Sequence, residues 1–103
     1  MTVKEFSKYV IDNMKRASLA NALNITKKLD TKDGYSFKEF VTEMTSYVGT
    51  LLDSGKYSNI TLYKLLAVLD NSYKMYTSDI KYNNQMIIDD LIISIWEILD
   101  TEV

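Results

Sequence analysis

The chain has 103 residues, of which 47% are hydrophobic and 25% charged, and its formal net charge is −2. These values are typical of one globular domain, and they argue against a disordered chain and against a general nucleic-acid binder. Cysteine and histidine are absent, which excludes disulfides, thiol nucleophiles, Cys/His zinc sites and histidine-based catalysis. We expect a single helical domain over residues 1–103, because proline is also absent and only three glycines occur.

Two helical segments are predicted in the first 30 residues. Thr2 and Glu5 form a capping-box pattern, and apolar residues then recur three and four positions apart up to about Arg16. Ser18 fits the cap of a second segment, which ends near Lys28, where positive charge favours a helix C-terminus. The pattern fits two separate helices and one kinked helix equally well.

Two further helices are predicted in the middle of the chain. The third begins at Ser36, which pairs with Glu39 in a second capping-box pattern, and it ends at Asp53-Ser54-Gly55. The fourth has a leucine-rich face, and either Asn59 or Thr61 fits its N-cap.

The most apolar stretch, residues 83–99, is predicted to form the last and central helix. Three acidic residues and one serine interrupt its apolar residues, so other helices or a partner should cover nearly all of it. Asp89, Asp90 and Glu97 argue against a membrane span. We therefore expect an all-α fold, a compact bundle of about five helices around this C-terminal helix, with Trp96 shielded from solvent.

Acidic residues are concentrated at the C-terminal end. From Asn83 onward the chain has five acidic residues and no basic one, whereas the first 82 residues hold 12 bases and 9 acids. This asymmetry predicts a basic shell around the acidic end of the central helix.

No metal, cofactor or catalytic site is predicted. Helical di-metal sites use Glu-x-x-His pairs, and without histidine the acids of residues 83–99 are expected to be solvated or paired with lysines. The Asp30–Tyr35 segment begins like a calcium loop, but Lys32 and Phe37 break the ligand spacing. A glycine-rich phosphate loop is also absent from the sequence. We therefore expect a protein that is not an enzyme and has no cofactor.

Tyrosine is the residue type that points to a possible binding surface. Five of the eight tyrosines occur in the fourth helix and its two flanking loops. Tyrosine is enriched at protein interfaces because it contributes a large contact area with few rotatable bonds, but it also packs at core edges. Both interpretations apply to the candidate interface residues, which are Tyr57, Tyr63, Tyr73, Tyr76 and Tyr82.

The fourth and fifth segments resemble the end of the collar domain of sliding-clamp loaders. The run LYKLLAVLDNSYKMYTSDIKYNNQMIIDDLIISI has a leucine-rich helix, a turn containing Asn83, and a last helix in which an acid separates two apolar groups. That acid is Asp89, where family members usually have Glu. The family includes replication factor C and the gamma/tau, delta and delta-prime subunits of bacterial DNA polymerase III. The matching apolar positions are Met86, Ile87, Ile88, Leu91, Ile92 and Ile95.

The resemblance implies a non-catalytic protein–protein interaction module that assembles subunits at the replication fork, with replication ATPase subunits as partners. The family's nucleotide-binding and lid regions have no counterpart here. The alternative is a small helical effector from a phage or mobile element that binds and inhibits one host protein, which fits the Lys/Asn/Ile/Tyr-rich composition and the Met1 start. With no signal sequence, we expect a cytoplasmic protein without direct nucleic-acid or membrane contact; a homo-oligomer is compatible with both interpretations.

Overall fold

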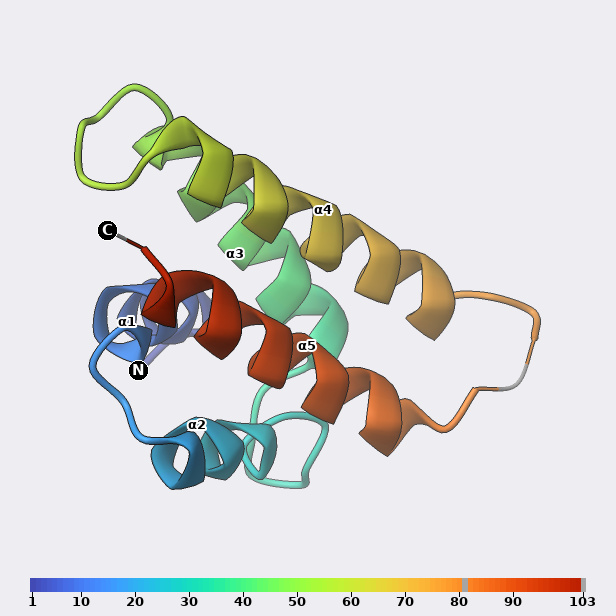
Figure 1. The fold of residues 1–103 in the computed structure, drawn as a ribbon. Coiled ribbons are helices and arrows are strands. Elements are labelled where there is room, and N and C mark those ends of the chain that lie inside the picture. The colour runs from blue at the N-terminus through green and yellow to red at the C-terminus, as the bar shows by residue number, and fades with distance from the viewer. Residues whose placement is uncertain (81, 103) are drawn as a thin grey trace.

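The computed structural model describes residues 1–80 and 82–102, which fold into five helices without a β-strand (Figure 1). The all-α prediction is therefore confirmed, and the first two segments are separate helices rather than one kinked helix. Leu29 and Tyr35 form an isolated β-bridge in the loop before the third helix. The helices are α1 (Val3–Met14), α2 (Leu19–Thr26), α3 (Phe37–Leu51), α4 (Asn59–Tyr76) and α5 (Asn84–Asp100).

A side-chain cap fixes the start of every helix. Each capping oxygen accepts a hydrogen bond from the backbone N–H three residues further on, which satisfies an otherwise unpaired donor. The capping box predicted at Thr2 and Glu5 is complete, because Glu5 Oε1 also accepts from Thr2 N at 3.1 Å. At Ser36 the described residues show only the forward bond, from Glu39 N. The five caps are Thr2, Ser18, Ser36, Ser58 and Asn83.

The predicted cap of α4 was wrong, because Ser58 takes this position instead of Asn59 or Thr61. Ser58 Oγ accepts from Thr61 N at 3.2 Å, while the Asn59 side chain bonds to Asp53. Glu102, just beyond α5, accepts from Ser58 N at 2.8 Å, from Ser58 Oγ at 3.3 Å and from the Thr61 hydroxyl. We call Ser58, Thr61 and Glu102 the C-terminal clasp, because they join the start of α4 to the end of the described chain.

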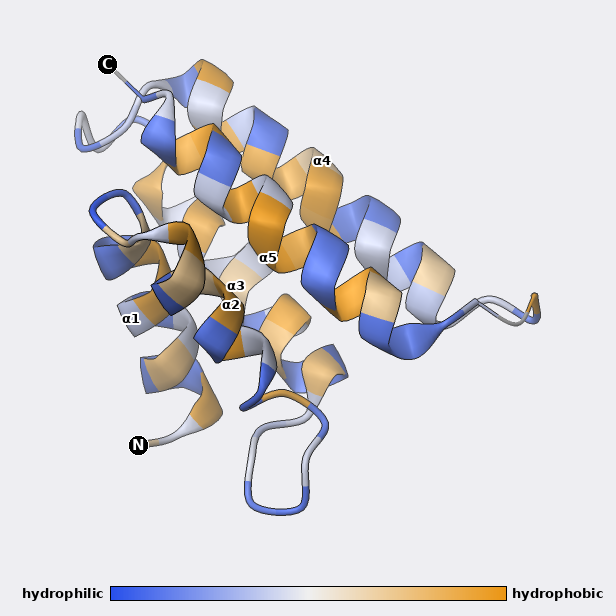
Figure 2. Cartoon of the chain, turned by 60° about the horizontal axis from the view of Figure 1, so that its bottom comes forward, coloured by the Kyte–Doolittle hydropathy of each residue, from blue (hydrophilic) through white to orange (hydrophobic). Residues whose placement is uncertain are grey.

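Helix α5 packs against α1, α2 and α4, but it is not enclosed on all sides. One side is buried in the core, whereas the opposite side carries exposed acids and the half-buried Ile93. Hydrophobic and hydrophilic residues alternate along the helix (Figure 2). The expected near-complete enclosure is thus only partly right, because three neighbouring helices cover only part of the circumference. Within the described residues, no helix combines the length and apolarity needed to cross a bilayer. The buried side consists of Ile87, Ile88, Leu91, Ile92, Ile95 and Leu99.

Trp96 is half-buried, which is less shielding than the sequence predicts. Its indole Nε1 donates a hydrogen bond to the backbone oxygen of Ala17 at 2.8 Å. This bond satisfies the polar end of the ring and holds the α1–α2 connection against α5.

Candidate protein-interaction surface

Tyr76, at the end of α4, is part of an internal contact rather than a free surface. Its ring packs on Phe37 with a centroid distance of 4.8 Å, and its hydroxyl donates to Asp30 Oδ2. Asp30 Oδ1 in turn accepts from Phe37 N at 2.8 Å. Asp30, Phe37 and Tyr76, which we call the Asp30 junction, therefore link the α2–α3 loop, the start of α3 and the end of α4.

The Asp30 junction predicts a specific loss of stability at alkaline pH. The hydrogen bond to Asp30, followed by burial, raises the pKa of Tyr76 to about 12. Because the folded pKa lies above the ordinary value of about 10, this bond stabilises the protein fully below pH ~10 and loses its effect as the pH rises towards ~12.

We expect the wild type to be more stable than Tyr76→Phe near neutral pH and this difference to shrink between about pH 10 and 12. Urea denaturation of both proteins across that range measures the difference. Tyr47 and Tyr57, whose pKa values are raised mainly by burial, are present in both proteins and cancel in the comparison. A difference that stays constant up to pH ~12 would contradict the role of the hydroxyl.

Tyr57 also faces the interior. It lies half-buried in the α3–α4 loop, and its hydroxyl is 3.5 Å from the backbone oxygen of Ile11 in α1. Burial, together with the negative charges of Asp12 and Glu102, raises its pKa. For Tyr57 and Tyr76 the structure therefore favours packing at the core edge.

Tyr63, Tyr73 and Tyr82 remain exposed, but the structure does not gather them into one patch. Tyr63 is 59% exposed near the start of α4, and Tyr82 is 43% exposed in the α4–α5 connection. Tyr63 and Tyr73 are ten residues apart, which places them about 15 Å apart along the axis of α4. The predicted cluster is close in sequence but spread along α4 and over the loops at both of its ends.

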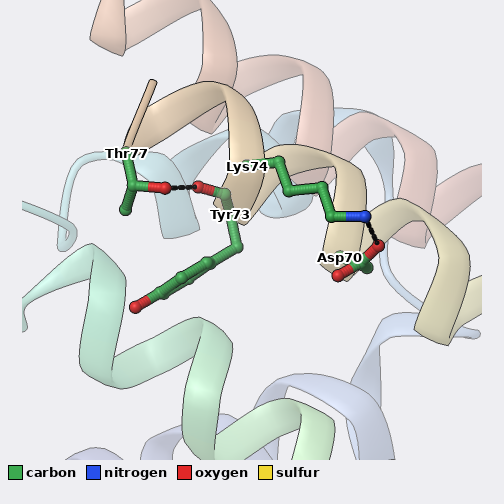
Figure 3. Close-up of polar contacts among 4 residues, drawn as sticks. All are labelled: Asp70, Tyr73, Lys74 and Thr77. Carbon is green, nitrogen blue, oxygen red and sulfur yellow. Dashed lines mark hydrogen bonds and ion pairs between the residues drawn. The ribbon is translucent and has the colours of Figure 1, made fainter. Parts of the chain in front are cut away.

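Tyr73 points from α4 towards α3 (Figure 3). It lines a shallow groove of about 240 Å³ with Val41 and Leu69, among other residues of the two helices. Beside it, Lys74 Nζ and Asp70 Oδ2 form an exposed ion pair at 2.9 Å. A pair of this kind stabilises a helix by only about 0.3–0.5 kcal/mol, so it adds little to the stability of α4.

The α4–α5 connection and the first turn of α5 expose large apolar side chains that the sequence pattern did not indicate. Ile80 is 65% and Met86 is 60% exposed, on either side of Tyr82. We call Ile80, Tyr82 and Met86 the α4–α5 tip, because they lie in or next to the connection that projects beyond the helices (Figure 1). Helical periodicity could not identify these residues as exposed, because Ile80 lies in a loop and Met86 fits the apolar run of the last helix.

The described residues show no arrangement suited to metal binding. No three of their Asp or Glu side chains lie close enough together to hold an ion. Their buried side-chain polar atoms all have hydrogen-bond partners. What this part of the chain offers to a ligand is exposed aromatic and aliphatic surface, which suits contact with another macromolecule.

Comparison with known protein families, curated proteins and solved structures gives no match for this chain. The resemblance to clamp-loader collars therefore stays a prediction.

Proposed function

We propose that this chain is a non-catalytic protein-binding domain that contacts its partner through the α4–α5 tip. The main support is the exposure of three large apolar side chains within seven consecutive positions, in a projecting connection and the first turn of the helix that follows it. Single exposed apolar residues are common, whereas grouped ones mark interaction sites. Tyr82 adds a ring that covers a large area at a low entropic cost.

The proposed partner is a subunit of a replication ATPase assembly. The resemblance of α4 and α5 to clamp-loader collars supports this choice, since the tip joins the two helices that carry the resemblance. Capture of one unrelated protein through the same tip would favour the effector function instead.

We expect Tyr82→Ala to weaken partner binding by at least about 1–2 kcal/mol, or roughly tenfold, while the fold stays unchanged. The side chain is exposed, so its removal costs little folding energy. A pull-down with the wild-type chain identifies the partner, and calorimetry with wild type and variant measures the loss of affinity.

Tyr63→Ala is the matched control, because Tyr63 is an even more exposed tyrosine that lies outside the tip. We expect this variant to bind like the wild type. If Tyr63→Ala weakens binding and Tyr82→Ala does not, the outer face of α4 is the interface and the assignment to the tip is wrong.

A further inference from the structure

A groove of about 520 Å³ lies between α1 and α2. Its floor includes the apolar side chains of Met14, Ala17 and Ile25, and its rim includes Arg16, Lys28 and three asparagines. An apolar floor with a cationic and amide-bearing rim suits a segment that presents apolar and acidic side chains together.

The two charged residues that line this groove, Arg16 and Lys28, are both basic. Residues 13–29 contain four basic residues and no acidic one. Among the described residues, the ion pair present is Lys74–Asp70 in α4, so Arg16 and Lys28 have no carboxylate within ion-pair distance there. The two cations that line the groove are therefore available to acidic side chains of a partner.

The outward side of α5 has the complementary chemistry. Asp90, Ile93, Glu97 and Asp100 follow one another at spacings of three, four and three residues, which places them on one stripe about 15 Å long. The three acids are exposed, and Ile93 is half-buried. We call these four residues the acidic stripe.

The acidic stripe cannot fill the groove of its own chain. It lies opposite the side of α5 that is buried in the core, so it points away from α1 and α2, against which α5 packs. A second copy can present the stripe without this restriction.

We propose that the groove between α1 and α2 receives the acidic stripe of a second copy of this chain, so that copies associate head to tail. This inference goes beyond the proposed function, because it uses surfaces other than the α4–α5 tip and a second copy as the partner. A pair joined in this way keeps the free groove of one copy and the free stripe of the other, so association continues into a ring or an open chain. Attraction between exposed charges is screened by salt, so the assembly is weak and salt-sensitive.

Sedimentation velocity of the wild-type chain tests the proposal. We expect the average mass to rise above the monomer mass of 11.9 kDa with increasing concentration at ~0.05 M salt, and to return to it at ~1 M salt. A protein that stays monomeric at the highest soluble concentration in low salt overturns the proposal.

Two charge-reversed variants test which surfaces meet. The groove variant carries Arg16→Glu and Lys28→Glu, and the stripe variant carries Asp90→Lys and Glu97→Lys. All four positions are exposed, so each variant should keep its helical circular dichroism and thermal transition. We expect each variant alone to associate at least tenfold more weakly than the wild type.

An equimolar mixture of the two variants should regain wild-type association. In the mixture, the acidic groove of the first variant meets the basic stripe of the second, and the unchanged basic groove of the second meets the unchanged acidic stripe of the first. An interface between two identical surfaces would not recover in this way. Failure of the mixture to recover contradicts the head-to-tail arrangement. Tyr82→Ala should self-associate like the wild type, because Tyr82 lies outside the groove and the acidic stripe. A monomeric wild type would therefore contradict head-to-tail association without contradicting partner binding through the α4–α5 tip.

Discussion

Ile92→Ala is expected to lower the free energy of unfolding by about 2–5 kcal/mol, because it opens a cavity in a packed site. Ile92 is completely buried on the core side of α5. A domain of this size has a total stability of about 5–15 kcal/mol, so the loss removes a large share of it. Urea denaturation followed by circular dichroism should show a lower midpoint with an unchanged slope.

Ile93→Ala is the matched control for this prediction. The two positions are adjacent and undergo the same chemical change, but Ile93 is half-buried on the opposite side of α5. We expect Ile93→Ala to lower the free energy of unfolding by less than about 1 kcal/mol, because only part of this side chain is buried in the wild type. Equal losses at the two positions would show that α5 is enclosed on both sides, contrary to the structure.

Asp30→Ala is expected to cost about 2–3 kcal/mol through the loss of the Asp30 junction. The substitution removes the acceptor of the Phe37 N–H and of the Tyr76 hydroxyl, and hydrogen bonds to a charged group contribute about 1.5–3 kcal/mol each before solvent exposure reduces them. Asp30 also has a φ of 54°, a left-handed conformation that alanine adopts less readily than aspartate. Thermal or urea unfolding measures the loss.

Two other substitutions at Asp30 separate these causes. Asp30→Asn keeps an acceptor and tolerates the left-handed backbone, so it should cost less than about 1 kcal/mol. Asp30→Gly removes the acceptor, but glycine adopts the left-handed backbone readily. Its loss of stability should therefore lie between those of the asparagine and alanine variants. An alanine variant as stable as the wild type would show that the junction does not stabilise the fold.

The helices were predictable because their signals are local. Thr2, Ser18 and Ser36 precede amphipathic segments, and each caps the helix expected of it. The cap of α4 was missed because several suitable residues follow one another there. Ser58 also bonds to Glu102, 44 residues away, and a contact at that separation leaves no periodic trace in the sequence.

The candidate site was less predictable because exposure depends on tertiary partners. Tyr57 and Tyr76 each contact a residue 46 positions away, Ile11 and Asp30 respectively. Nothing in the local pattern distinguishes them from the exposed Tyr63. The opposite error occurred in α5, where counting apolar residues predicted near-complete enclosure although one stripe faces solvent.

The C-terminal clasp makes α4 and α5 a closed frame. The chain itself joins the two helices at the α4–α5 tip (Figure 1), and the Glu102 carboxylate joins them at the other end through its hydrogen bonds. Its bonds to Thr61 and Ser58 lower the pKa of Glu102, so the clasp holds at neutral pH and is lost as the pH falls through that lowered value. Acid therefore weakens the link between the start of α4 and the end of the described chain, while the covalent link at the tip and the packing of α4 on α5 stay in place.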